Sequence, residues 1–257
     1  MPEDSPAGST DAVLTERRGR VLLITLNRPD AMNAINGDLS RRVVAAVAEL
    51  DDDPTLTAGV LTGNGRGFCS GMDLKAFAAG EDIGPMLEFI KNGSKKPLIG
   101  ALEGFALAGG LELALTCDLL VAAKGIKMGI PEVNVGLFAA GGGLQRLPSR
   151  IGYARAMEMA ITADPITSDE AADAGMVSRL VEPGEAIEVA LGLAERISKN
   201  APLAVSASKQ LIKAAVDLDE EAFWEKQNEF LYVFGTNDAK EGPKAFAEKR
   251  PPEWTGT

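Results

Sequence analysis

Short runs of aliphatic residues alternate with segments of helical periodicity in the first half of this chain, and this alternation constrains the fold most. Three runs predict strands: Val21 to Leu26, Gly59 to Leu61 and Pro97 to Leu102. Between them, Leu39, Val43, Val47 and Leu50 recur at helical spacing, and Ile83 to Ile90 predicts another helix. Alternation of strands and helices is typical of an α/β fold.

The last quarter of the chain is helical in pattern throughout. Helices are expected over four segments, Ile187–Ile197, Ala204–Val216, Glu220–Phe234 and Ala239–Lys249. The first twelve residues are acidic and small, without the basic and apolar regions of a targeting sequence. We therefore expect a disordered tail over 1–12, an α/β core over 13–195 and a helical region over 196–257.

The charge and the residue types that are absent exclude several classes of protein. The 257 residues carry a net charge of −11 without a basic stripe, which argues against nucleic acid or an anionic membrane as partner. No apolar run approaches the roughly 20 residues of a membrane span. The chain has no histidine, which excludes Ser-His-Asp catalysis and imidazole zinc sites. The two cysteines, Cys69 and Cys117, lie in apolar surroundings and are expected to be buried thiols in a reducing cytoplasm.

Two glutamates lie in apolar, glycine-rich surroundings. Glu112 sits in AGGLELAL, and Glu132 follows Pro131 in GIPEVNVG. A carboxylate buried without a partner has a raised pKa, and two carboxyls in unlike environments can divide into an acid and a base. The structural alternative is that Glu112 pairs with an arginine or with a backbone amide, and that Glu132 is a turn residue facing water.

Glycines precede several of the expected helices. Gly109 and Gly110 open the helix of Glu112, where free N–H groups would suit a developing oxyanion. A second turn enters a helix at Cys69–Leu74, with Ser70 or Asp73 as its cap. Gly141 to Gly143 matches no phosphate-binding loop and is interpreted as a close-packed helix start.

Taken together, these segments resemble the crotonase (enoyl-CoA hydratase/isomerase) superfamily from about Val13 to the C-terminus. The motifs occur in the family's order and spacing. They are NRPDAMNA from Asn27, FCSGMDLK from Phe68, GFALAGGLE from Gly104, PEVNVG from Pro131, GGLQRLP from Gly142 and AADAGMV from Ala171.

The resemblance implies a fold and a reaction. The fold would be a crotonase-type spiral of ββα repeats followed by a helical trimerisation region. The reaction would be reversible addition of water to a 2-enoyl-CoA through a thioester enolate, held by the backbone amides of Met72 and Gly109. Glu132 would protonate the α-carbon, while Glu112 would hold and deprotonate the water. Neither a metal nor a redox cofactor is expected, since coenzyme A arrives as part of the substrate.

The resemblance also places the substrate contacts. Coenzyme A and substrate contacts would come from Arg28, Ala31, Asp73, Leu74, Lys75, Phe246 and Lys249, the last two often reaching a neighbouring subunit. Ala139 and Leu144 depart from the common Pro-Gly-x-Gly-Gly-Thr-Gln pattern and would line the acyl pocket. A homotrimer or a hexamer, as a dimer of trimers, is expected.

Other functions stay open at this point. The same scaffold supports Δ3-Δ2 isomerisation, which needs one proton shuttle, and dehydration of a 3-hydroxyacyl-CoA. A third alternative is an acyl-CoA-binding protein without catalysis. The acyl length, the pathway and the choice between trimer and hexamer do not follow from the sequence.

Overall fold

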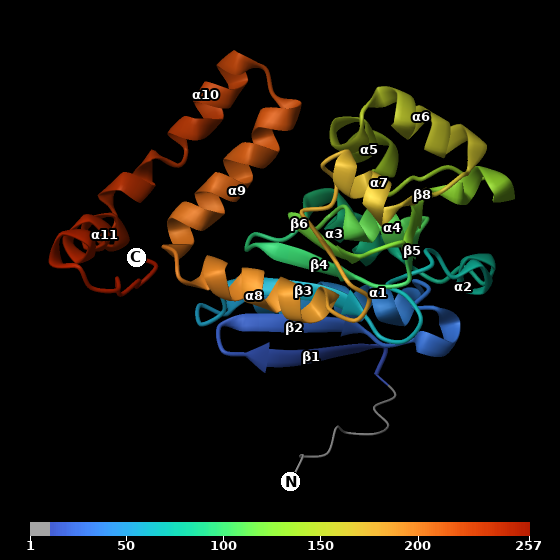
Figure 1. The fold of residues 1–257 in the computed structure, drawn as a ribbon, viewed down its shortest axis with the longest axis horizontal. Helices are drawn as coiled ribbons and strands as arrows, with labels where there is room; N and C mark the ends of the chain where they lie inside the picture. The colour runs from blue at the N-terminus through green and yellow to red at the C-terminus, as the bar shows by residue number, and fades with distance from the viewer. Residues whose placement is uncertain (1–10) are drawn as a thin grey trace, which may run out of the picture.

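A six-stranded sheet forms the centre of the computed structural model, which describes residues 11–257 (Figure 1). Its strand order is β1-β2-β3-β4-β6-β9, and only the β1–β2 pair is antiparallel. The strands are β1 (Val13–Arg18), β2 (Val21–Leu26), β3 (Ala58–Gly63), β4 (Leu98–Leu102), β6 (Leu119–Ala123) and β9 (Arg179–Val181). The α/β expectation is confirmed.

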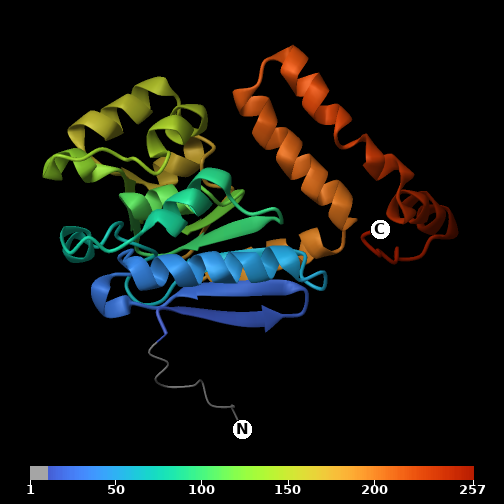
Figure 2. The same ribbon diagram turned by 180° about the vertical axis from the view of Figure 1, so that it is seen from behind.

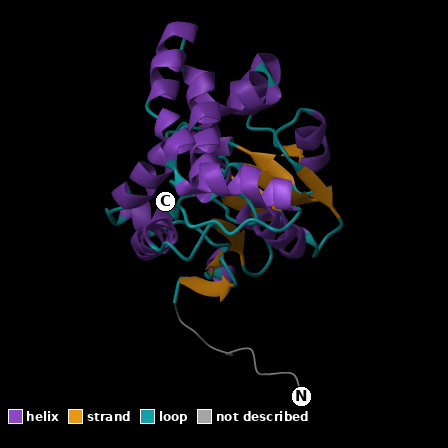
Figure 3. Cartoon of the chain, turned by 90° about the vertical axis from the view of Figure 1, so that its left-hand side faces the viewer, coloured by secondary structure: helices purple, strands orange, loops and turns teal. Residues whose placement is uncertain are grey.

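The sheet is covered by helices on both faces, which explains why its strands read as continuous apolar runs. One face packs with α1 (Gly37–Asp52), whose Leu39, Val43, Val47 and Leu50 are all buried as the spacing predicted. The other face packs with α8 (Ala186–Ser198) through Ala190 and Ala194. Figure 3, coloured by element type, shows helices packed over the strands.

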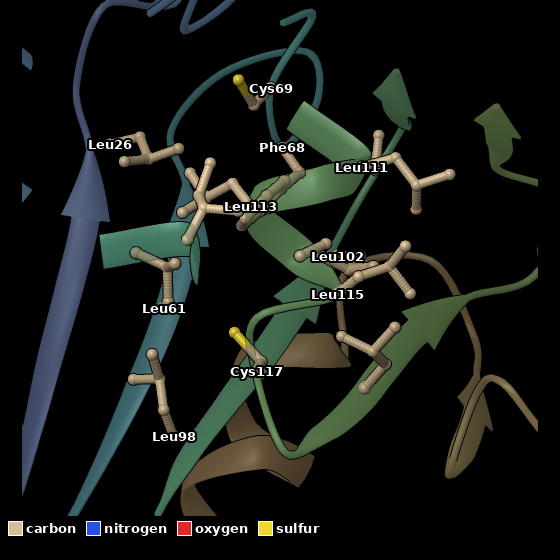
Figure 4. Packing of buried hydrophobic residues seen from close by; sticks show 14 of the residues in the cluster. Leu26, Leu61, Phe68, Cys69, Leu98, Leu102, Leu111, Leu113, Leu115 and Cys117 are labelled. Atoms are coloured by element: carbon tan, nitrogen blue, oxygen red, sulfur yellow. The ribbon is translucent and has the colours of Figure 1, made fainter. Parts of the chain in front are cut away.

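A second, three-stranded sheet lies beside the first and carries the elements of greatest interest. Its order is β5 (Phe105–Leu107), β7 (Lys127–Gly129) and β8 (Ile166–Thr167), with β5 parallel to β7. The short helix α4 (Gly109–Ala114) follows β5 and is enclosed by the core. Leu111 and Leu113 of this helix are buried, and Figure 4 shows them among the other side chains of the hydrophobic core.

The remaining helices of the core surround these sheets. They are η1 (Pro29–Ala31), α2 (Leu74–Ala78), α3 (Gly84–Asn92), η2 (Pro131–Val135), α5 (Gly143–Ile151), α6 (Tyr153–Thr162) and α7 (Ser168–Asp173). Gly143 begins α5, which confirms the expected helix start after the glycine run.

The C-terminal helices extend away from the core, as Figures 1 and 2 show from opposite sides. They are α9 (Pro202–Asp217), α10 (Glu220–Asn228), η3 (Leu231–Gly235) and α11 (Asn237–Glu248). The single helix expected over Glu220–Phe234 is wrong, because α10 ends at Asn228 and a 3-10 segment follows. Asn and the run Tyr-Val-Phe all have weak helix propensity, which accounts for the break.

The predicted boundaries of the core, after residue 12 and after residue 195, can be compared with the structure. Residues 1–10 of the expected tail lie outside the described residues. Ala12 is buried, and its carbonyl accepts a hydrogen bond of 2.8 Å from the N–H of Asn27. At the other end, α8 stays on the sheet and runs three residues beyond the expected boundary at 195. No helix within residues 11–257 is long and apolar enough to cross a membrane.

The fully buried side chain of Asn33 joins two loops. Its amide nitrogen donates to the carbonyls of Asn64, Gly67 and Phe68 at 2.9 to 3.0 Å. Its amide oxygen accepts from the backbone N–H of Arg28 at 2.9 Å. Asn33 itself has a left-handed backbone (φ 55°), which Asn tolerates better than most residues.

Replacing Asn33 by Ala is expected to lower the free energy of unfolding by about 2–4 kcal/mol, because buried carbonyls lose their donor. Urea unfolding measures this change. Asn200→Ala, at an exposed position, is the matched control. Equal stability of the two variants would contradict the joining role of Asn33.

Candidate functional site

Glu112 and Glu132 are brought together by the parallel pairing of β5 and β7. Leu107 at the end of β5 is opposite Gly129 at the end of β7, and the N–H of Ala108 donates to the Gly129 carbonyl at 2.8 Å. Glu112 lies in the helix that follows β5, and Glu132 lies in η2, which follows β7. Both carboxyls therefore come from the carboxyl end of the same small sheet.

Glu112 is only 4% exposed, and its carboxylate has specific donors. Oε1 accepts a hydrogen bond of 2.8 Å from the N–H of Gly143. Burial raises the pKa of Glu112, while the amides of Gly143 and Gly141 and the positive charge of Arg146 act in the opposite direction. Glu112 therefore does pair with a backbone amide, as the structural alternative predicted. The same hydrogen bond is compatible with a role as a base, because it would hold the ionised carboxylate in place.

The turn Gly141–Gly143 fits closely around this carboxylate. A Cβ atom on Gly141 would lie 2.7 Å from Oε2 of Glu112, and one on Gly143 would lie 3.1 Å from Oε1. The guanidinium of Arg146 donates to the Gly141 carbonyl at 3.2 Å and to the Ile90 carbonyl at 2.5 Å, which holds the turn against α3. Arg146 was not singled out from the sequence. Its position three residues after the glycine run was the available signal.

Glu132 has the opposite environment. It is half-buried, and its Oε2 is enclosed without a hydrogen-bond partner among residues 11–257. Burial, with a smaller contribution from the negative charge of Glu112, raises the pKa of Glu132 to about 7 against the lowering effect of its own backbone amide. Near neutral pH this carboxyl is therefore present in both protonation states, as an acid must be.

Two backbone amides lie next to each other at the start of α4. A Cβ on Gly71 would lie 3.0 Å from the nitrogen of Gly109, and a Cβ on Gly109 would lie 3.7 Å from the nitrogen of Met72. Within residues 11–257, neither the Met72 nor the Gly109 N–H has a hydrogen-bond acceptor. These are the two amides that the motifs predicted.

Two residues to which the motifs gave no role, Ala108 and Gly110, shape this amide pair. Ala108 has φ 51° and ψ −134°, a strained conformation for a residue with a Cβ, and it sets the orientation of the Gly109 peptide. Gly110 allows close approach, since a Cβ there would lie 2.2 Å from the Cys69 carbonyl oxygen. Cys69 is buried, and burial raises the pKa of its thiol to about 12.

A cavity of about 350 Å³ opens beside Glu132 between η2, α5 and α6. Its lining is apolar or aromatic apart from this carboxyl, and it includes both residues assigned to the acyl pocket. Among the residues that line it are Glu132, Ala139, Leu144, Tyr153, Met157 and Ile161. The acyl role of Ala139 and Leu144 stays a prediction.

The expected coenzyme A contacts fall into two groups. In the first, Asp73 caps α2 by accepting from the N–H groups of Lys75 and Ala76. Arg28 donates to Asp73 Oδ2 at 3.1 Å and to the Ala34 carbonyl. Burial raises the pKa of Asp73, but hydrogen bonds from these amides and from Arg28 outweigh burial and lower it. Ala31 is half-buried in η1, whereas Leu74 and Lys75 are exposed.

The second group is far from the first within one chain. Phe246 is 87% exposed on α11, and Lys249 follows that helix in a left-handed conformation. In Figures 1 and 2, α11 lies away from α4. One protomer does not bring Phe246 and Lys249 to the glutamates.

No group of three or more His, Cys, Asp or Glu side chains within residues 11–257 is arranged to hold a metal ion.

Comparison with known proteins places these features in a family. Residues 16–257 match the family model described as enoyl-CoA hydratase/isomerase. The chain is 40% identical over 253 residues to an enoyl-CoA hydratase of Mycobacterium tuberculosis, covering 94% of this chain and 95% of the relative. It is 36% identical over 251 residues to the 2,3-dehydroadipyl-CoA hydratase of Escherichia coli, with 95% and 98% covered.

Solved structures show the same likeness. The crystal structure of an enoyl-CoA hydratase from Mycobacterium tuberculosis H37Rv matches with a TM-score of 0.93 and 51% identity. The match covers 96% of this chain and 100% of that chain.

The raised pKa of Glu132 predicts a stability cost that grows with pH. The carboxyl ionises near pH 4.5 in the unfolded chain and near 7 in the native protein, so the native state binds the extra proton between these values. Wild-type stability therefore falls relative to Glu132→Gln as pH rises from about 4.5 through 7. The gain in melting temperature of Glu132→Gln over wild type should be larger at pH 8 than at pH 5.

Glu158→Gln, an exposed position on α6, controls for the loss of one negative charge. A gain for Glu132→Gln that is the same at both pH values, or that matches Glu158→Gln, would count against the raised pKa.

Proposed function

The chain belongs to the enoyl-CoA hydratase/isomerase family, and we propose that it adds water reversibly across the 2,3 double bond of a 2-enoyl-CoA. One observation carries this proposal. Among residues 11–257, two carboxyls in unlike environments, Glu112 with amide donors and Glu132 with an unpartnered Oε2, stand near two backbone amides that have no acceptor there.

The amide pair supports the role of an oxyanion hole. The thioester carbonyl oxygen would accept hydrogen bonds from the N–H groups of Met72 and Gly109. When water adds at the β-carbon, negative charge develops on this oxygen, and fixed donors stabilise that charge more than they stabilise the ground state. Loss of one such donor typically costs about 10²–10³ in rate.

The carboxyls divide the proton transfers. Ionised Glu112 takes a proton from water as the oxygen bonds to the β-carbon, and the electron pair of the double bond moves toward the thioester oxygen. Neutral Glu132 then donates its proton to the α-carbon as the enolate collapses. One proton has moved onto Glu112 and one has left Glu132, so exchange with solvent restores the starting state.

Substrate binding and assembly complete the proposal. Arg28 and Lys75 would lie near the nucleotide of coenzyme A, with Ala31, Asp73 and Leu74 beside it, and Phe246 and Lys249 would reach coenzyme A on a neighbouring subunit. Exposed apolar side chains along the C-terminal helices, such as Ile212 and Phe234, favour a trimer or a dimer of trimers. The reaction needs no cofactor besides the coenzyme A of the substrate, and the buried thiols fit a cytoplasmic location.

The test follows the ultraviolet absorbance of the conjugated thioester when the protein meets 2-hexenoyl-CoA in water. We expect absorbance to fall for wild type, and kcat to drop about 10²–10⁴-fold in Glu112→Gln and in Glu132→Gln, because each removes one proton transfer. Glu158→Gln is the control and should keep wild-type turnover.

Two outcomes would contradict hydration. Turnover of a 3-enoyl-CoA that survives in Glu112→Gln would indicate isomerisation, which needs one proton shuttle. Tight thioester binding without turnover of enoyl or 3-hydroxyacyl substrates would indicate a binding protein.

A further inference from the structure

The cavity beside Glu132 contains more space than the smallest enoyl group needs. Its volume is about 350 Å³, and a water molecule in the liquid occupies about 30 Å³, so the cavity matches roughly a dozen non-hydrogen atoms. A four-carbon enoyl group has only one methyl group beyond its double bond. Filling this space therefore requires a longer acyl tail.

Small residues create this space. Ala139 and Ala156 are buried in the wall of the cavity, and Ala160 lines it one helical turn further along α6. Larger side chains at the same positions would occupy the volume that an acyl tail needs. The far side opens to solvent, since Tyr153 and Ile161 line the cavity and are 71% and 67% exposed.

The described residues that line the cavity offer no cation to a charged tail. Apart from Glu132, the described residues that line it are apolar or aromatic, and none is a cation. Arg155 lies on the same helix, but its guanidinium donates to the Glu170 carbonyl at 3.1 Å. A carboxylate placed in this cavity would lose water without gaining a cation, and it would also lie near the carboxyl of Glu132.

We infer that the site takes acyl-CoA substrates with an uncharged hydrocarbon tail that extends to at least about eight carbons in the acyl group, and rejects tails that end in a carboxylate. This inference rests on the proposed function for the identity of the site. It separates this chain from its relative in Escherichia coli that is named for 2,3-dehydroadipyl-CoA, a substrate with a terminal carboxylate.

Binding of saturated acyl-CoA thioesters tests the inference without requiring turnover. Isothermal titration compares butyryl-, hexanoyl-, octanoyl- and adipyl-CoA. Adipyl-CoA has six acyl carbons like hexanoyl-CoA, but a carboxylate replaces the terminal methyl group. The dissociation constant should fall about fourfold for each methylene added up to octanoyl. Adipyl-CoA should bind on the order of a hundredfold more weakly than hexanoyl-CoA.

A variant locates the effect in this cavity. Ala160→Phe should reduce the ratio of octanoyl to butyryl affinity at least about tenfold, because the ring fills part of the space. Ala154→Phe, at an exposed position on the same helix, is the matched control and should keep the wild-type ratio. Circular dichroism of both variants reports whether the helix still forms, and the wild-type series stands without them.

The possible results separate the two proposals. Affinity that does not change with chain length, or adipyl-CoA binding as tightly as hexanoyl-CoA, overturns the inference whether or not the protein hydrates enoyl-CoA. The expected binding series without hydration of 2-octenoyl-CoA keeps the assignment of the cavity and overturns the hydratase function.

Discussion

The parallel pairing of β5 with β7 is the contact on which the whole site depends. The two strands are only three residues long, and they end at the same level with Leu107 opposite Gly129. The hydrogen bond from Ala108 to Gly129 extends this register by one residue, at the point where the chain turns into α4. A one-residue change of register would turn side chains to the other face of the strand, so both glutamates and the Gly109 amide would lose their arrangement together.

The burial of α4 makes this arrangement rigid. Leu111, Leu113 and Ala114 are fully buried, so the six-residue helix is held by its packing rather than by its own hydrogen bonds (Figure 4). Glu112 therefore carries its carboxylate into the core, where the Gly143 amide donates to it. Glu132 stands on a 3-10 segment at the edge of a cavity, and its Oε2 has no hydrogen-bond partner within residues 11–257. The same sheet edge thus holds two carboxyls in unlike environments.

Much of this could be predicted from the sequence, because the responsible signals are local. The apolar runs and the spacing of Leu39, Val43 and Val47 predicted the α/β core, and the motifs singled out Glu112, Glu132, Met72 and Gly109, whose catalytic roles stay predictions. Other features depend on contacts between distant segments. The closeness of the Gly141–Gly143 turn to Glu112 and the strained backbone of Ala108 depend on how β5, β7 and α5 pack, which no local pattern encodes. The helix break after Asn228 reflects the weak helix propensity of the local residues, which a prediction from hydrophobic periodicity alone does not detect.

The proposed reaction depends on hydrogen bonds from the Met72 and Gly109 amides to the oxygen of the substrate thioester. The carbon-13 resonance of the carbonyl of a labelled saturated acyl-CoA bound to the protein reports on these bonds. Two fixed donors polarise the carbonyl, so we expect a downfield shift on binding, in wild type and in Glu112→Gln alike. A bound thioester whose carbonyl resonance stays at its position in free solution would show that the two amides do not hold the oxygen.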